Sequence, residues 1–209
     1  MNGYPLEIAE TSVCRTMADT AVKIDISDNA LISQTIKGRI RAFRELVIRY
    51  QKRAFLYARA MVGNTDDAYD LSQEAFIRVY KHLGRFDQAY PFKVWFFHIL
   101  SNLCKNHLRQ RQNRAKITVS SEMTEATAVP TSQRPDIVFE KSELQQQLWN
   151  SIAELPEKFR EIIILSHFQE MSYEQISKAL EIPRGSVMSR LYYARRKLHD
   201  ILEEKGITL

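Results

Sequence analysis

Apolar residues recur every three or four positions along most of this chain, and this helical period is the feature that most constrains its fold. The pattern is longest between residues 40 and 61, where it is carried by Ile40, Phe43, Leu46, Val47, Tyr50, Ala54, Tyr57, Ala58 and Met61. A long amphipathic helix of this kind buries its apolar face against other helices. The alternating period of a strand does not compete with it, so the sequence predicts an all-α protein.

Punctuating residues predict where the first helices begin and end. A short helix is expected from Ser27 or Asp28, with Gly38 separating it from the long helix. The run 63–65, Gly-Asn-Thr, breaks the chain again. The next helix opens on Asp66 and Asp67, whose charges suit the positive end of a helix dipole. Its expected inward residues are Leu71, Ala75, Phe76, Val79, Tyr80 and Leu83.

The stretch 86–116 places aromatic residues directly before basic ones. The aromatic residues are Phe86, Tyr90, Phe92, Trp95, Phe96 and Phe97, and the cations are Lys105, Arg109, Arg111, Arg114 and Lys116. Aromatic platforms beside cations suit unpaired bases, because stacking on one base is worth about 1–3 kcal/mol while cations hold the phosphates. Asn102, Lys105 and Asn106 could hydrogen-bond an extruded base.

A purely structural interpretation competes with this one. Aromatic residues at helical spacing are usually core, and we expect Phe92, Phe96 and Ile99 to be core. Phe86, Tyr90 and Trp95 stay open between core and binding surface. A basic helix end is otherwise most often a solvated face.

Composition changes abruptly after Lys116. The segment that follows has two prolines, many Ser and Thr residues and no apolar period, as in a flexible linker. The chain of 209 residues therefore divides into two small helical domains. We expect a flexible N-terminal lead at 1–27, a first domain at 28–112, the linker at 113–136 and a second domain at 137–205. Met17 is a possible alternative translation start.

The second domain contains a helix-turn-helix pattern. Ser172 and Gln175 form a predicted capping box, and Glu181 to Pro183 turn the chain into a basic second helix. Val187, Leu191, Ala194, Leu198 and Ile201 are expected inward. The expected outward residues are Arg184, Ser186, Ser189, Arg190, Tyr193, Arg196 and Lys197. Such a helix presents its N-terminal half to base edges in the major groove. The cations Arg195, Arg196 and Lys197 suit phosphates.

Charge and cysteine content narrow the classes of function. The net charge of +5 is modest, but the charges are unevenly distributed. Basic residues gather at 105–116 and 184–197, and acidic residues gather at Asp66, Asp67, Asp70 and Glu74. Two basic patches indicate two contacts with one polyanion. Cys14 and Cys104 do not suggest a disulfide framework, and the five histidines do not assemble a metal site. No apolar run approaches a membrane span, so we expect a cytoplasmic protein without metal or cofactor.

Four stretches together resemble one family. They are A-F-R-E-L-V-I-R-Y at 42–50, D-D-A-Y-D-L-S-Q-E-A-F-I-R-V-Y at 66–80, the aromatic–basic stretch, and the segment from L-P-E-K-F-R at 155 to the end of the helix-turn-helix. In this order they resemble a bacterial RNA polymerase sigma factor of the sigma-70 family, in its extracytoplasmic-function group. The resemblance implies a sigma factor, not an enzyme, that directs core polymerase to promoters, melts them, and responds to a stress or envelope signal.

The resemblance also implies roles for residues. Asp70, Leu71, Gln73, Glu74 and Phe76 match the surface that docks on the clamp of the largest polymerase subunit. The residues that match the minus-ten reading and melting surface are Phe86, Trp95, Asn102, Lys105, Asn106 and Arg109, with Phe86 and Asn102 near a flipped base. Those that match the minus-thirty-five helix are Arg184, Ser186, Ser189, Arg190 and Tyr193. The flap of the second-largest subunit, duplex and single-stranded promoter DNA, and an anti-sigma factor are the other implied partners.

Departures from the family pattern concern DNA sequence preference more than role. Tyr69 stands where an acidic residue is usual in the family. Met188 and Tyr193 stand where basic residues are frequent. Two other classes of protein remain as alternatives. A stand-alone helix-turn-helix regulator would bind duplex DNA unaided and would leave the acidic helix without a role. An enzyme acting on DNA, such as an invertase or a nuclease, would need a nucleophilic Ser or Tyr among arginines, or a cluster of metal-binding carboxylates. The one such cluster in the sequence is Asp66, Asp67, Asp70 and Glu74.

Overall fold

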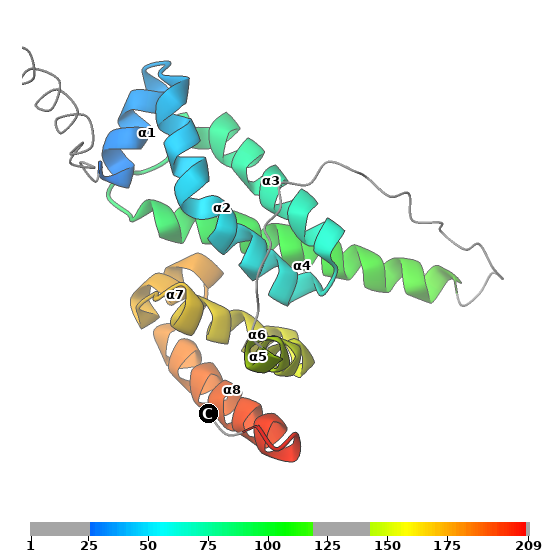
Figure 1. The fold of residues 1–209 in the computed structure, drawn as a ribbon. Coiled ribbons are helices and arrows are strands. Elements are labelled where there is room, and N and C mark those ends of the chain that lie inside the picture. The colour runs from blue at the N-terminus through cyan, green and yellow to red at the C-terminus, as the bar shows by residue number, and fades with distance from the viewer. Residues whose placement is uncertain (1–25, 119–142, 208–209) are drawn as a thin grey trace, which may run out of the picture.

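The computed structural model describes residues 26–118 and 143–207, and in these ranges every regular element is helical. The predicted all-α, two-domain fold is confirmed. Figure 1 shows the helices that precede residue 119 in one group and those that follow residue 142 packed beside them. The N-terminal lead up to residue 25 and the predicted linker from residue 119 onward lie outside the described residues.

The first domain consists of α1 (Asp28–Ile36), α2 (Ile40–Val62), α3 (Thr65–His82), the 3₁₀ turn η1 (Leu83–Arg85) and α4 (Phe92–Thr118). The helix α4 continues through residues 113–118 of the predicted linker. Gly63 ends α2 with a φ of 78°, a left-handed conformation that glycine adopts without steric cost. Asn64 then caps α3, because its side chain accepts from the Asp66 and Asp67 backbone N–H groups at 2.7 and 3.0 Å. The predicted break at 63–65 is therefore where α2 and α3 meet.

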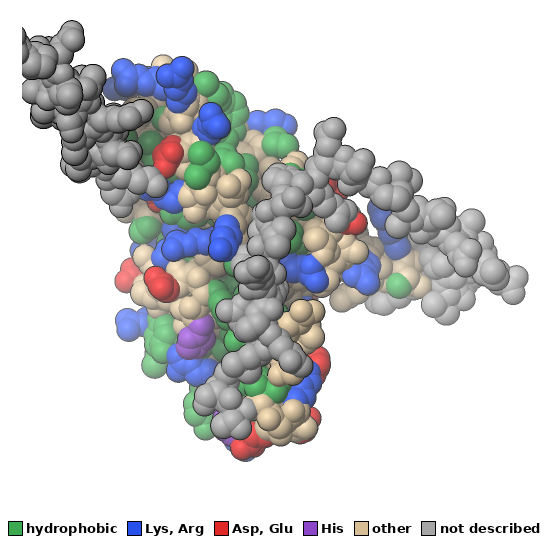
Figure 2. Space-filling model, viewed as in Figure 1, with side chains coloured by type: hydrophobic (Ala, Val, Ile, Leu, Met, Phe, Trp, Pro, Cys, Tyr) green, Lys and Arg blue, Asp and Glu red, His purple; other side chains and the backbone are tan. Residues whose placement is uncertain are grey.

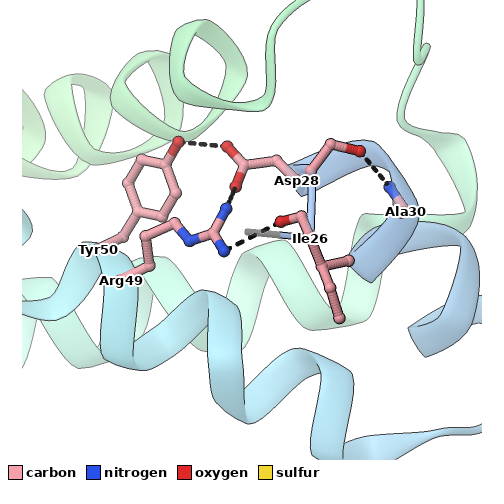
Figure 3. Close-up of polar contacts among 6 residues, drawn as sticks. Ile26, Asp28, Ala30, Arg49 and Tyr50 are labelled. Atoms are coloured by element: carbon pink, nitrogen blue, oxygen red, sulfur yellow. Dashed lines mark hydrogen bonds and ion pairs between the residues drawn. The ribbon is translucent and has the colours of Figure 1, made fainter. Parts of the chain in front are cut away.

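A carboxylate at the start of α1 fixes this short helix to α2 (Figure 3). Asp28 accepts from the Arg49 guanidinium at 2.7 Å and from the Tyr50 hydroxyl at 2.5 Å. Arg49 also donates to the Ile26 carbonyl at 3.0 Å, and the Ser27 side chain caps α1 by accepting from the Ala30 N–H. Burial, followed by the bond to Asp28, raises the pKa of Tyr50, so its hydroxyl stays protonated and donates.

Aromatic side chains of α2 and α4 form the centre of the first domain. Tyr50 packs against Phe92 and Phe96, and Tyr57 packs against Phe97. Phe92 and Phe96 are buried as expected, whereas Ile99 is only half-buried. The prediction that Tyr80 points inward is wrong, because half of this side chain is exposed. Phe76, Val79 and Leu83 form the buried stripe of α3 and η1, while Tyr80 lies at its edge against Phe43, with ring centroids 4.9 Å apart.

The second domain consists of α5 (Glu143–Glu154), α6 (Glu157–Ile163), the π-helical turn η2 (Ile164–Phe168), α7 (Tyr173–Leu180) and α8 (Arg184–Glu204). Both bonds of the predicted capping box form: the Ser172 hydroxyl accepts from the Gln175 N–H at 3.2 Å, and the Gln175 side chain accepts from the Ser172 N–H at 3.0 Å. Glu181 ends α7 with a φ of 53°, and α8 follows after Pro183. The chain thus forms the expected helix-turn-helix. Its core is built from Ile152, Ile162, Ile176, Val187, Leu191 and Ala194.

The two domains are in direct contact. The helix α7 lies along α4, and α5 and α6 approach the C-terminal half of α2 (Figure 1). Arg160 of α6 shows how close this packing is. Its guanidinium donates to the backbone carbonyls of Met61 at 2.8 Å and Ala60 at 3.3 Å, at the end of α2. The same guanidinium also donates to Leu155 at 2.9 Å in its own domain. One side chain thus joins the two domains.

Candidate nucleic-acid interface

The polar residues expected to read an extruded base lie on one exposed side of α4. Asn102, Asn106 and Arg109 are spaced four and three residues apart, and all three are exposed. Lys105 is half-buried, with 30% of its side chain exposed. The helix therefore brings two amides and a guanidinium to one face, with the ammonium of Lys105 at its edge.

The aromatic residues predicted beside this face differ in exposure. Phe86 is 9% exposed and packs in the core against Phe92, whereas Tyr90 is 44% exposed and Trp95 is half-buried. Phe86 and Trp95 pack ring to ring, and both line a cleft of about 510 Å³. The question that the sequence left open is thus answered residue by residue: Phe86 is a core residue at the rim of a cleft, and Tyr90 and Trp95 offer ring surface outside the core.

The second domain closes one side of that cleft. Lys178 and Glu181, from α7 and its end, line it together with Tyr90 and Trp95. The Lys178 ammonium lies 4.8 Å from the centre of the Tyr90 ring, a cation–π contact between the domains. An aromatic surface suited to stacking is therefore in contact with the helix-turn-helix domain.

A chain of polar contacts leads from Asn102 to the second domain. The Asn102 amide lies 3.1 Å from His98 Nε2, and His98 Nδ1 lies 3.0 Å from the Ala179 carbonyl oxygen. A carbonyl oxygen only accepts, so Nδ1 carries the proton and Nε2 accepts from the amide. Asn102 is in this way held indirectly by α7.

A buried carboxylate, which the sequence analysis missed, joins the two domains at their centre. Glu161 of α6 is 2% exposed, and its Oε1 atom accepts from Tyr57 Oη at 3.1 Å and Ser101 Oγ at 2.5 Å. The same oxygen lies 2.9 Å from Lys105 Nζ. Burial, with the nearby Glu161 charge second, raises the pKa of Tyr57 well above its ordinary value, so the phenol donates. The one sequence signal for this site is a pair of charged residues, Arg160 and Glu161, inside the otherwise apolar run 159–165.

The acidic helix α3 presents only part of the predicted docking set. Asp70 and Gln73 are exposed, and Glu74 forms an ion pair with Arg78 at 2.8 Å. Leu71 and Phe76 are 9% and 8% exposed and pack into the core of the first domain. The accessible chemistry of this surface is therefore acidic and amide, with Ile77 and Tyr80 as exposed apolar neighbours.

The second basic surface lies on α8. Arg184, Ser189, Tyr193, Arg195, Arg196 and Lys197 are exposed, and Ser186 and Arg190 are half-buried. The Ser189 hydroxyl donates to the Ser186 carbonyl at 3.2 Å, which keeps that side chain on the helix surface. On the face drawn in Figure 2, Lys and Arg side chains occur over both domains. Each domain thus has its own basic surface.

Among the residues that the structure describes, the remaining titratable groups form no evident reaction centre. Within the described ranges, one set of side chains is close enough to share a cation, namely His199, Asp200 and Glu203, and all three are exposed on one helix. This set includes none of the acidic residues of α3, Asp66, Asp67, Asp70 and Glu74. Burial, with Glu161 second, raises the pKa of the Cys104 thiol to about 12, which leaves it protonated and a weak nucleophile. Among the described helices, none is long and apolar enough to cross a membrane.

Comparison with known proteins identifies both domains. Residues 46–114 match the family model of Sigma-70 region 2, and residues 145–198 match that of Sigma-70 region 4. The chain is 32% identical over 181 residues to the RNA polymerase sigma-H factor of Pseudomonas aeruginosa, a match that covers 84% of this chain and 94% of the relative. It is 30% identical to the ECF RNA polymerase sigma factor SigW of Bacillus subtilis, over 83% of this chain and 95% of the relative.

Solved structures agree on the fold. The structure of CnrH in complex with the cytosolic domain of CnrY has a TM-score of 0.63 and 24% identity, and the match covers 85% of this chain and 97% of that one. The sigma factor RpoE of Bartonella quintana, solved with the anti-sigma factor NepR, has a TM-score of 0.63 and 22% identity, with 77% and 96% covered. The chain belongs to the sigma-70 family of RNA polymerase sigma factors, in its extracytoplasmic-function group. Its role is that of a sigma factor rather than a stand-alone regulator.

Proposed function

We propose that this chain directs core RNA polymerase to promoters by using its two basic surfaces on two promoter elements. The observation that carries the proposal is the pair of matches to regions 2 and 4 in one chain, each falling on a domain with an exposed basic helix face. Two readers in one chain raise each other's local concentration at DNA. The first domain, placed at 28–112, melts and reads the minus-ten element, and the second, at 137–205, binds the minus-thirty-five element as duplex.

In the first domain, Asn102, Asn106 and Arg109 contact the unpaired strand, with Lys105 on a phosphate. Trp95 supplies a stacking surface, and Phe86 supports Trp95 from the core. Flipping a base costs a few kcal/mol, which stacking, pocket hydrogen bonds and phosphate contacts offset. These interactions are non-covalent, so the chain acts as an initiation factor and not as an enzyme.

In the second domain, the N-terminal half of α8 enters the major groove. Arg184 and Arg190 suit guanine, which an arginine binds bidentately with about 1–3 kcal/mol of discrimination. Ser186, Ser189 and Tyr193 extend the same surface, and Arg195, Arg196 and Lys197 contact phosphates. The turn between α7 and α8 presents this helix as in other helix-turn-helix proteins.

Polymerase is the partner that joins the two activities. Asp70, Gln73 and Glu74 dock on the clamp of the largest subunit, with Leu71 and Phe76 supporting α3 from beneath. The second domain contacts the flap of the second-largest subunit. An anti-sigma factor holds the chain inactive, a kind of partner with which the fold relative RpoE of Bartonella quintana was solved. The chain works in the cytoplasm, where polymerase and promoters are.

Transcription by purified core polymerase, with and without this protein, tests the proposal. Genomic promoter fragments are pooled as templates, and transcripts are sequenced from their 5′ ends. We expect discrete starts that require the protein and that share an upstream motif. Random starts that are the same with and without the protein would contradict the proposal. The variant Arg190→Ala should lower the yield at every specific start, whereas Glu203→Gln, at the far end of α8, should not.

A further inference from the structure

The turn that joins α1 to α2 carries a surface to which the proposed contacts with promoter and polymerase give no role. It lies at the end of the first domain that points away from the second domain, roughly 30 Å from Gly63 along the 23 residues of α2 (Figure 1). Six exposed residues form this surface, and we call them the basic tip: Ile36, Lys37, Arg39, Ile40, Arg41 and Arg44. Figure 2 shows Lys and Arg side chains gathered at this end of the molecule, with hydrophobic side chains beside them.

Folding gives no reason for the arginines of the basic tip. In the described part of the chain, the side chains of its four cations form no ion pair or hydrogen bond with another residue. Arg39 and Arg41 stand at the start of α2, where the positive end of the helix dipole disfavours a cation, and the first turn contains no acidic residue. Arg44 adds a like charge one turn further on, and like charges on one helix face repel. An anion outside the chain would relieve this repulsion.

Exposed apolar side chains alternate with these cations. Ile36 and Ile40 are each more than half exposed. Ile48, which is exposed to the same degree, follows Ile40 and Arg44 at four-residue intervals and so extends this surface along one side of α2. A soluble protein normally exposes large apolar residues singly, whereas a group of them among polar residues marks an interaction surface. The end of the first domain thus combines positive charge with isoleucine side chains.

The partner that fits both properties is an anionic lipid surface. Its phosphate headgroups attract Lys and Arg, and its acyl chains begin within the depth of about 5–10 Å that an amphipathic surface segment reaches. Nucleic acid offers phosphates but no apolar layer, and its unpaired bases stack on aromatic rings, which the six residues of the basic tip do not include. A partner helix would instead choose a groove, such as the apolar cleft between α5 and α8.

We propose that the basic tip binds an anionic membrane surface peripherally, with its four cations at the lipid phosphates and its two isoleucines inserted beneath them. The contact is reversible, because a basic patch and two isoleucines are each weak anchors and hold the chain only together. In this orientation the second domain, at the other end of α2, is turned away from the lipid (Figure 1). The inference goes beyond the proposed function and does not rest on it.

Flotation of the full-length protein with lipid vesicles tests this proposal. The anionic probe is a vesicle of phosphatidylglycerol and phosphatidylethanolamine, and the neutral one is a vesicle of phosphatidylcholine. The double variant Arg39→Glu with Arg41→Glu reverses two charges of the basic tip. The double variant Ile36→Asn with Ile40→Asn removes its apolar side chains and leaves its charge unchanged. All four residues are exposed, so circular dichroism should show the helix content of the wild type in both variants.

We expect the wild type to float with the anionic vesicles, less so as the salt concentration rises, and not with the neutral ones. The arginine variant should bind the anionic vesicles about ten-fold more weakly or worse, and the isoleucine variant about three-fold more weakly. Arg196→Glu with Lys197→Glu is the matched control, because it makes the same change of net charge at two exposed residues of the second domain. Its binding should change by less than about two-fold.

Four results would overturn the inference. The first is a wild type that does not float with anionic vesicles. The second is an equal loss in the control and the arginine variant, because general adsorption of a basic protein would then explain the binding. The third is unchanged binding by the isoleucine variant, which would exclude insertion. The fourth is an arginine variant that keeps vesicle binding but loses affinity for labelled DNA, which would make the basic tip a nucleic-acid contact. Specific transcription by core polymerase does not bear on any of these results, so the proposed function stands or fails separately.

Discussion

The indole ring of Trp95 lies against the phenyl ring of Phe86, with centroids 4.8 Å apart and planes inclined by 31°. Phe86 is buried and Trp95 is half-exposed, so the pair extends from the core of the first domain to its surface. One ring of the pair supports the other. This arrangement predicts that the two residues fail in different ways when they are replaced.

Trp95→Ala should weaken single-stranded DNA binding and leave the fold intact. Loss of one stacking surface costs about 1–3 kcal/mol, which is about five-fold to 150-fold in affinity. Phe86→Ala should instead lower the free energy of unfolding by about 3 kcal/mol, as expected of a large residue lost from a core. Anisotropy with a labelled strand and urea denaturation measure the two effects. Equal loss of stability in both variants would contradict the assignment.

Asp28→Asn should loosen the start of the first domain. The Asp28 carboxylate joins α1 to α2 by accepting from Arg49 with one oxygen and from Tyr50 with the other (Figure 3). The amide of the variant has one acceptor oxygen and no negative charge, so it cannot replace both bonds. We expect a loss of about 1–2 kcal/mol in urea denaturation, at the modest end for charged hydrogen bonds because the ion pair is about a quarter exposed. Glu74→Gln, in the exposed pair with Arg78, serves as control and should cost about 0.5 kcal/mol or less.

Reversal of the charge on α3 should weaken polymerase docking without unfolding the chain. Asp70 is exposed, so Asp70→Lys changes the acidic surface and not the core. We expect about a ten-fold weaker complex with core polymerase in the absence of DNA, and the loss should be larger at low salt. Glu203→Lys makes the same charge change on the second domain. If both variants bind polymerase as the wild type does, α3 is not the docking surface.

The Cys104 thiol should be unreactive in the native protein. Burial raises its pKa to about 12, so at pH 8 almost no thiolate is present. In Cys14→Ser, where Cys104 is the remaining cysteine, an aromatic disulfide reagent should react slowly until guanidinium unfolds the chain. The unfolded thiol ionises near pH 8.5 while the folded one stays protonated, so stability should fall as the pH rises from about 8 towards 11. Rapid native reaction at pH 8 would contradict the burial.

Local signals in the sequence predicted most of the fold. Gly63 and Asn64 act through their own backbone and side-chain chemistry, and Ser172 and Gln175 cap a helix that they themselves begin. Such features depend on neighbours in the chain, so a linear pattern contains them. Tyr80 was misplaced because it lies at the margin of the apolar stripe, where a turn of a few tens of degrees separates core from solvent.

The interface between the domains could not be predicted in the same way. Glu161 meets Ser101 and Lys105 across some 60 residues of sequence, and only the packing of α6 against α2 and α4 brings them together. In the sequence alone, Lys105 is one of several cations in a basic run, and Ser101 is a small polar residue that follows the aromatic residues of the same helix. The residue roles themselves came from family resemblance, because helical spacing alone does not tell a DNA surface from a solvated face.

Promoter opening, mapped by permanganate oxidation of unpaired thymines, tests the central claim most directly. Core polymerase with the wild-type chain should expose thymines just upstream of a start site identified by transcript sequencing. With Asn102→Ala, the promoter should remain bound but largely closed, and with Arg190→Ala the promoter should be neither bound nor opened at matched concentrations. Thymine exposure by Asn102→Ala equal to that of the wild type, or opening by core polymerase without this chain, would contradict the account.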